Sequence, residues 1–519
     1  MMDSSPQRGK ERNCLIKPSK HPFNKAHYNA IRMLLGMLVI MGYATGVHAG
    51  GLEFPGIGTQ AAGRGGAYVA KATGGSAFLY NPAGLAKSTG KDLLVSFQLV
   101  NLRLDYQRTG SGGYWLDTPG DNLSPTCPPQ QICIADPALD YSDSALGQPF
   151  SEVSMSKSGP LPVLVFNWGN FVNVKGLSVS VGLVPPSGFA AFSLPESGAQ
   201  RYTLVNSAHF IIFPGIGLAY KFNRYFQLGG VFMSGIAHLN QTLKIRPLPS
   251  MANSAFNEGA GGDANLEISA LDPFVPTAVI GVMSLPTDWL ELGVSVKLPA
   301  MISAKGSMVY DAPSNDMTDS YMEKGKDQTR LEQHFPLKVS AGVRFIANRF
   351  DIEADFVFEN WASLSGFDIF PDAAITDPID ANVVVDTPMP DTQIIKNYRN
   401  TYCGRLGSTI AVLPRFLDIH LGSFYQSSAY PKNNNTFNLD VPYATQIGVA
   451  GGISVAIGDR LDIHLSYLHI FQPDISVSNG VIQQQGLPLS TGENIGNTVN
   501  NGTYEVAINI LGIAGEVHF

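Results

Sequence analysis

The chain has 519 residues, a net charge of −8 and 15% charged residues, against roughly 25% in an average soluble domain. It contains 54 glycines, above the usual share of about 7%, and only four cysteines. This composition excludes a disordered chain and a disulfide scaffold, and the acidic balance argues against a nucleic-acid binder. Low charge and high glycine content instead favour one large β structure whose outer face does not contact water.

The first 49 residues are typical of an export signal. Basic residues precede one apolar run, residues 33–43, and Val47-His48-Ala49 follows as a small-x-small cleavage pattern. The alternative is a membrane anchor, but the run is shorter than the ~20 residues that a spanning helix needs. We therefore predict cleavage after Ala49. No later stretch reaches 18 uncharged apolar residues, which excludes a helical membrane protein for the mature chain.

Alternation with a period of two dominates the remaining chain. In residues 350–361 apolar side chains occupy one face and mostly acidic side chains the other. In residues 333–346 Phe335 begins the apolar face. The charged residues on the polar faces of these two predicted strands are Lys338, Arg344, Asp351, Glu353, Asp355 and Glu359.

Three features distinguish this alternation from that of a soluble sandwich, which also alternates. The predicted strands are long, tight turns alternate with long polar connections, and the chain ends on the aromatic residue Phe519. The long connections lie near 106–158, 247–270, 311–331, 371–394 and 477–503. The predicted fold class is therefore all-β, a transmembrane antiparallel barrel.

Fourteen strands are predicted, an even number as a bacterial barrel requires. They are residues 92–105, 161–174, 177–189, 207–222, 225–246, 272–285, 289–310, 333–346, 350–361, 396–413, 416–430, 443–457, 461–475 and 504–519.

The segment before the first strand, from Gly50 to Lys87, does not alternate and is rich in Gly and Ala. It is too short to form a domain of its own, so we expect it to pack against the inner wall as a plug. A phosphate-binding loop is the alternative, but the G-K-[ST] ending is missing. We divide the chain into a signal peptide (1–49), an N-terminal hatch (50–90) and a barrel (91–519).

Two motifs in this segment resemble a known family. Gly63-Arg64-Gly65-Gly66-Ala67-Tyr68 and Asn81-Pro82-Ala83-Gly84-Leu85 resemble the hatch of the FadL-like family, the outer-membrane long-chain fatty acid transporters. Residues 182–188 are similar to the family's Pro-Phe-Gly stretch, residues 213–221 to the following strand, and residues 353–361 to a Glu-x-Asp…Asn-Trp strand.

The resemblance implies a fourteen-stranded barrel, plugged by its hatch, that takes up hydrophobic molecules by diffusion. Ligand is then caught in an extracellular apolar groove, passes to an interior pocket and leaves sideways at a kinked third strand. The hatch residues that it points to are Phe54, Arg64, Tyr68, Asn81, Pro82, Ala83 and Gly84.

The predicted third strand ends in Pro185-Pro186-Ser187-Gly188. Consecutive prolines remove ladder donors, and in a closed barrel such a break leaves a gap in the wall. We expect the lateral opening at Pro185, Pro186, Gly188 and Phe189; the alternative is that the prolines only end the strand. Phe189 and Phe192 either line the path or are exposed loop aromatics.

The lumen charges allow two interpretations. One of the cations could hold a fatty acid carboxylate, or the charges pair with one another and with the hatch, as the cost of buried unpaired charge favours. In the second case Arg64 is an attractive partner for the acidic strand at 351–359.

The remaining reactive residues indicate no enzyme and no cofactor. Cys127 and Cys133 are expected to form a small disulfide in an exported loop, with metal ligation as the alternative, and Cys403 remains a free thiol. The histidines at 420, 464, 469 and 518 lack metal-ligand spacing, and no nucleophile elbow is present.

Four functions fit the sequence: fatty acid uptake, which we favour, aromatic hydrocarbon uptake in the same barrel, an adhesin or structural barrel, and a surface protease or phospholipase. The expected location is the bacterial outer membrane. The expected partners are a hydrophobic ligand, outer-membrane lipid and lipopolysaccharide, and the assembly machinery through Phe519, with a monomeric protein and no nucleic acid.

Overall fold

The computed structural model describes residues 56–109, 150–185, 191–245, 263–311, 322–325, 329–371, 373–380, 383–388, 391–484 and 498–519. The predicted signal peptide, Phe54, Pro186, Gly188, Phe189 and the Cys127–Cys133 disulfide lie outside these residues. No helix within them is long and apolar enough to cross a membrane.

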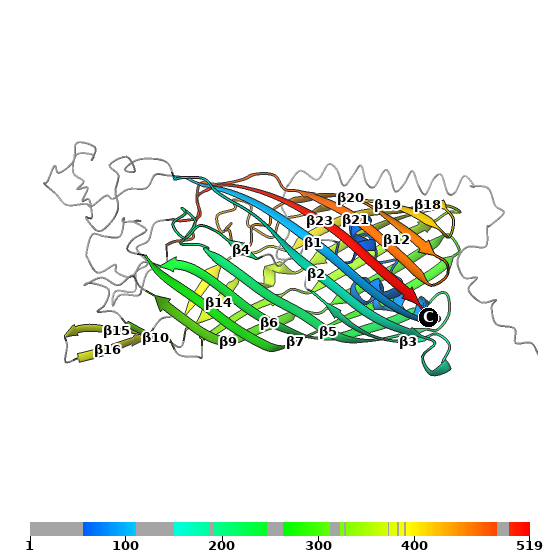
Figure 1. Cartoon of the computed structure of the whole chain (residues 1–519), viewed down its shortest axis with the longest axis horizontal. Helices are drawn as coiled ribbons and strands as arrows, with labels where there is room; N and C mark the ends of the chain where they lie inside the picture. The colour runs from blue at the N-terminus through cyan, green and yellow to red at the C-terminus, as the bar shows by residue number, and fades with distance from the viewer. Residues whose placement is uncertain are drawn as a thin grey trace, which may run out of the picture.

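Long strands wind round one axis and form a tube (Figure 1). Fourteen spans make up its wall within the described residues, several of them broken into two pieces. They are β1 (Lys91–Arg108), β2 (Val153–Gly169), β3 (Leu177–Val184) with β4 (Phe192–Ser193), β5 (Asn206–Lys221), β6 (Gln227–Ile245), β7 (Ala264–Thr287), β8 (Leu290–Lys297) with β9 (Ala300–Asp311), β11 (Thr329–Phe335) with β12 (Lys338–Ile346), β13 (Phe350–Glu359) with β14 (Gly366–Phe370), β17 (Thr392–Ile395) with β18 (Thr401–Leu413), β19 (Leu417–Gln426), β20 (Gln446–Ile457), β21 (Leu461–Phe471) with β22 (Ile475–Val477), and β23 (Gly502–His518).

The tube closes because the last strand pairs with the first. β1 and β23 are antiparallel in continuous register, from Asp92 opposite His518 to Arg108 opposite Gly502. Each other span pairs antiparallel with the next along the chain. The predicted fourteen-stranded antiparallel barrel is therefore confirmed. A separate sheet of β10 (Met322–Gly325), β15 (Ala373–Asp380) and β16 (Val383–Pro388) lies at one end (Figure 1).

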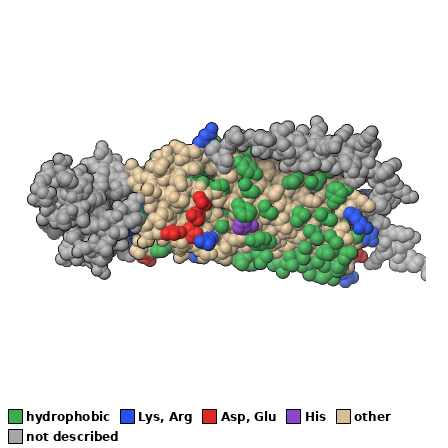
Figure 2. All heavy atoms as spheres, turned by 90° about the horizontal axis from the view of Figure 1, so that it is seen from above, with side chains coloured by type: hydrophobic (Ala, Val, Ile, Leu, Met, Phe, Trp, Pro, Cys, Tyr) green, Lys and Arg blue, Asp and Glu red, His purple; other side chains and the backbone are tan. Residues whose placement is uncertain are grey.

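The outer face of the wall is apolar over part of its length. Leu511 and Ile513, on the outward side of β23, are 59% and 53% exposed. Figure 2 shows such side chains gathered toward one end of the barrel. Aromatic side chains ring the short turns of that end, among them Tyr220, Phe222, Tyr225, Phe226 and Trp289. A band of exposed apolar residues edged by aromatics is what lipid contact requires.

Two predicted strand starts were wrong. β2 begins at Val153 rather than at 161, and β7 begins at Ala264 rather than at 272. Here the strands extend beyond the apolar band. The outward positions of β2 carry polar residues such as Ser154, Ser156 and Ser158, so the apolar outward face by which a membrane strand is identified is missing there. Part of each predicted connection is therefore strand.

The predicted face of Phe335 was also wrong. The span expected at 333–346 breaks at Pro336-Leu337, between β11 and β12, so the two pieces do not share one alternation. Phe335 is 1% exposed inside the tube, with its ring centroid 6.5 Å from that of Phe213.

The N-terminal segment, residues 56–87, lies within the tube at the end of the short turns (Figure 1). It consists of α2 (Thr59–Gly63), η1 (Gly74–Ser76), α3 (Ala77–Tyr80) and η2 (Pro82–Lys87). α2 contacts β19, β20, β21 and β23, whereas η2 contacts β5, β6 and β7 across the lumen. The segment therefore touches opposite sides of the wall.

Wall glycines allow this close approach. A Cβ added at Gly422 would lie 2.0 Å from the carbonyl carbon of Arg64, and one at Gly229 would lie 2.3 Å from that of Pro82. Any other residue at these positions would displace the segment, because backbone fills the space that its side chain needs.

Candidate functional site

Arg64 anchors the N-terminal segment to the acidic strand β13. Its guanidinium donates to Asp351 at 2.7 Å and to Glu353 at 3.0 Å, and it is fully buried. Lys71 Nζ lies 2.8 Å from the second Asp351 oxygen. Burial of these charges costs free energy that such short, multiply hydrogen-bonded pairs offset.

The backbone of the segment binds the same strand. The amide N–H groups of Tyr68 and Val69 donate to Asp355 at 2.8 and 3.1 Å, and that of Ala70 donates to Glu353 at 2.7 Å. Amide donors aimed at buried carboxylates replace the water that these groups lose.

A second group of charges joins the segment to neighbouring strands. Lys87 Nζ lies 2.5 Å from Glu291, and Arg344 bridges Glu291 and Asp351 at 2.8 Å each. Lys338 instead pairs with Glu359 at 2.9 Å, within the wall. Ion pairs among the described residues therefore account for five of the six lumen charges singled out in the sequence. The sixth, Asp355, instead accepts hydrogen bonds from backbone amides.

Burial alters the acid–base properties of this segment. Desolvation lowers the pKa of Lys71 to about 7, although Asp351 opposes the shift. It also raises the pKa of Tyr80 to about 12. The phenol therefore stays neutral at physiological pH.

The Asn-Pro-Ala-Gly turn is fixed by the Asn81 side chain. Its amide donates to the carbonyls of Val69 and Val282 at 3.1 Å each, and its oxygen accepts from the Ala83 N–H. Pro82 and Ala83 are buried, and Gly84 leaves no room for a Cβ beside the Ala72 carbonyl. The turn thus joins the segment to β7.

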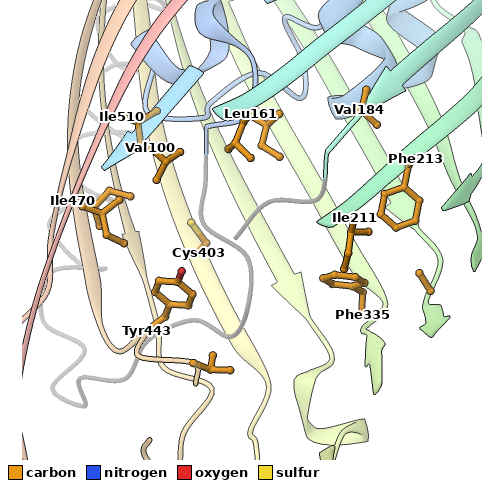
Figure 3. Close-up of a cluster of buried hydrophobic side chains, with 14 of the residues drawn as sticks. Val100, Leu161, Val184, Ile211, Phe213, Phe335, Cys403, Tyr443, Ile470 and Ile510 are labelled. Atoms are coloured by element: carbon orange, nitrogen blue, oxygen red, sulfur yellow. The ribbon is translucent and has the colours of Figure 1, made fainter. Parts of the chain in front are cut away.

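Beyond the N-terminal segment the lumen becomes apolar. Figure 3 shows buried side chains from strands around the tube converging on one region. They include Val100, Leu161, Val184, Ile211, Phe213, Phe335, Tyr443 and Ile510. Cys403 belongs to this cluster as a free, buried thiol.

A small cavity of about 60 Å³ shares Tyr443 with this region and has a mixed lining of apolar, polar and charged residues. Phe192, Phe367 and Tyr443 contribute aromatic lining. Asp440, in the connection between β19 and β20, also lines it and pairs with the fully buried Lys396 at 2.6 Å. Burial lowers the pKa of Lys396 even with this partner. The sequence does not reveal this ion pair, because Lys396 begins the predicted strand 396–413, Asp440 lies between two predicted strands, and neither stands in a run of charged residues.

Strand pairing beside β3 is interrupted among the residues that the structure describes. β2 pairs with β3 only from Leu164 to Gly169, and β3 ends at Val184, followed by the buried Pro185. Residues 153–163 of β2 pair with β1, and no strand among the described residues pairs with their other edge. On the outside nearby, a depression of about 420 Å³ is lined by Val181, Pro214, Ile216 and Phe232, among others.

The histidines form hydrogen bonds with neutral groups or carboxylates. His420 lies between Thr409 and Ser454, and the Ser454 hydroxyl also contacts His464. His518 contacts Asp92 and Asp462. Within the described residues, no group of three or more His, Cys, Asp or Glu is arranged to hold a metal ion.

The architecture has known counterparts. A family model described as "Outer membrane protein transport protein (OMPP1/FadL/TodX)" matches residues 40–511. The chain belongs to this family. It is therefore a FadL-family protein of the outer membrane, in a family that transports hydrophobic compounds, and the resemblance seen in its hatch motifs is confirmed.

Solved structures share the fold of this FadL-family chain. A Pseudomonas aeruginosa FadL homologue has a TM-score of 0.69 at 15% identity, covering 91% of this chain and 100% of that one. The Pseudomonas putida toluene transporter TodX has a TM-score of 0.56 at 13% identity, covering 90% and 99%. The CymD monoaromatic hydrocarbon channel has 0.54 at 14%, covering 89% and 98%. No curated protein sequence matches the chain.

Two prolines of this FadL-family chain, Pro160 and Pro162, lie within β2 and were not singled out from the sequence. The signal was present, because proline inside a strand is confined to edges and bulges. The predicted strand began at 161, so Pro160 was placed outside it and the significance of the pair was lost.

Proposed function

We propose that this FadL-family protein takes up long-chain fatty acids or similar hydrophobic molecules by passive diffusion. Residues 50–90 act as a hatch, and the wall beside β3 is a lateral exit. The observation that carries the proposal is the edge of β2 that has no strand partner among the described residues, beside an apolar lumen. A closed polar pore needs neither feature.

The driving force follows from the lining. Burial of an alkyl chain gains ~0.8 kcal/mol per CH₂, so sixteen carbons supply on the order of 10 kcal/mol gross. Leu161, Val184 and Ile211, on the inner face of the wall, provide apolar contacts for the ligand beside the proposed exit. A sideways exit into lipid avoids returning the chain to water.

The hatch explains how such a wide barrel avoids leaking. Its contacts with opposite walls and its ion pairs with Asp351, Glu353 and Glu291 fill one end of the lumen. Small polar solutes would then find no aqueous path, whereas an apolar ligand leaves before reaching the hatch.

Aromatic hydrocarbons are the second candidate substrates. Phe192, Phe367 and Tyr443 line the cavity, and rings of this kind pack well against aromatic ligands. Two of the similar structures are a toluene transporter and a monoaromatic hydrocarbon channel.

The remaining parts of the proposal concern partners. The exposed Phe519 at the end of β23 is available to the assembly machinery, and the apolar band contacts outer-membrane lipid and lipopolysaccharide. The protein acts as a monomer, because the barrel closes on itself through the pairing of β1 with β23. The transport needs no catalytic residue and no cofactor.

The test compares outer-membrane vesicles with and without the protein. Radiolabelled oleate, toluene and maltose are supplied separately, and each is also tested against an excess of the others. We expect faster oleate entry, competition between oleate and toluene if both use the cavity, and no change for maltose. Equal oleate and maltose entry would identify a general pore instead.

A further inference from the structure

The two edges of β2 differ in a way that singles out its prolines. Toward β1 the strand is paired without interruption, from Lys91 opposite Trp168 to Tyr106 opposite Val153. Toward β3 the pairing stops at Leu164. β4 approaches only at the far end, where the Ser193 N–H lies 3.3 Å from the Met155 sulfur. The stretch between Met155 and Leu164 has no strand partner on that side among the described residues.

The direction of each N–H along β2 can be derived from the ladder. The Gly169 N–H donates to the Gly90 carbonyl at 2.7 Å, which is on the β1 side. In an antiparallel sheet the N–H groups of successive residues point to opposite sides, and this register contains no bulge. Odd-numbered residues of β2 therefore face β1. Pro160 and Pro162 face the unpaired edge.

Both prolines lie at the height of the apolar band. Their partners on β1 are Leu99 and Phe97, which are 41% and 46% exposed on the outer face. An N–H group left unpaired in lipid costs several kcal/mol, so an ordinary residue here would strongly favour capture of another strand. Proline has no N–H, so at these two positions the edge keeps its carbonyl acceptors but lacks donors. Pairing with another strand needs donors as well as acceptors.

We propose that Pro160 and Pro162 hold the lateral exit open. They are positioning residues: they prevent the β2 edge from capturing a neighbouring segment and sealing the wall. This inference rests on the lateral exit of the proposed function. It assigns the opening to two residues of β2 as well as to the end of β3, and it explains why prolines stand in a strand that pairs without interruption with β1.

The variant Pro160→Val/Pro162→Val restores both donors with side chains suited to a strand. Uptake of radiolabelled oleate into vesicles should fall about tenfold, which corresponds to ~1.4 kcal/mol of barrier. Amide hydrogen exchange of the peptide that contains the two substituted positions should show two slowly exchanging amides. Phe97→Val is the matched control, since it alters the same lipid-facing patch without adding a donor, and its uptake should stay within about twofold of wild type.

Folding is checked by the shift in gel migration between heated and unheated samples. If the double variant does not fold, Pro160→Val and Pro162→Val are measured singly, and each should lower uptake partially. Unchanged uptake in a folded variant would overturn the inference, as would rapid exchange of both new amides. If wild-type protein does not transport oleate or toluene, the proposed function fails instead, and amide exchange still tests whether the edge captures a strand.

Discussion

The β12–β13 wall and the β2–β3 wall of the same barrel differ in both strand pairing and lining. β12 and β13 pair along their whole lengths and present Asp351, Glu353 and Asp355 to the lumen. β2 and β3 pair over six positions and present apolar side chains such as Leu161 and Val184. One wall holds the N-terminal segment in place, and the other is the wall at which we propose the lateral exit.

The difference shows how one alternating pattern serves two purposes. Outward residues in the band must be apolar because they contact lipid, whereas lipid places no such requirement on the inward residues. Charges inside are tolerated where hydrogen-bond partners are dense, and apolar residues line the lumen beside β2 and β3. Substitutions that disturb one region at a time test this difference.

The largest effect is expected for Arg64→Glu. The change replaces the cation between Asp351 and Glu353 with a third carboxylate, and loss of one partner of a buried pair typically costs about 3–5 kcal/mol. The hatch should leave its position, and vesicles should become permeable to maltose. Arg224→Glu, at an exposed turn, is the control and should remain impermeable. Normal hatch packing and maltose exclusion in Arg64→Glu would show that the pairing is unimportant.

A somewhat smaller effect is expected for Lys396→Met. Asp440 would remain buried without its cation, so the connection between β19 and β20 should loosen by about 3 kcal/mol. Faster amide exchange in residues 436–444 measures this. Lys432→Met, which removes an exposed lysine of the same connection, should leave exchange unchanged. Equal exchange in both variants contradicts the account of this pair.

The smallest effect is expected for Gly422→Ala, at about 1–3 kcal/mol. Its methyl group would overlap the Arg64 backbone, so the hatch must shift to make room for it. Protease sensitivity of residues 56–87 should increase. Gly404→Ala, where a Cβ meets nothing within 4 Å, is the matched control. Equal sensitivity of the two variants would mean that the hatch does not depend on glycine at this position.

The sequence allowed the barrel to be predicted because lipid imposes a strict period on outward residues. The alternation of 350–361 identified β13 within two residues of its observed end. It failed for the first part of β2, where Ser154, Ser156 and Ser158 face outward above the apolar band. Outside the band that contacts lipid, the outward face need not be apolar, so the alternation of side chains says little about where a strand begins.

The site was only partly predictable, because a contact between distant residues could be inferred only where their charges stand out in the sequence. Arg64 was paired with the acidic strand through charge complementarity, and the structure places the two together across 287 residues. Lys396 and Asp440 showed no such charge complementarity, because neither stands in a run of charged residues. Phe335 faces the lumen because the strand breaks at Pro336-Leu337, where the neighbouring strands also break. The sequence of one strand by itself does not reveal such a shared break.

The most direct test of the central claim is to locate the ligand during transport. Palmitate carrying a diazirine near its methyl end is photoactivated while it is being taken up by vesicles, and the labelled peptides are identified by mass spectrometry. We predict labels on β2 around Leu161 and Val163 and on β3 at Val184, which border the open edge. Labels confined to residues 56–87 would mean that the ligand passes along the axis through the hatch, and would contradict a sideways exit.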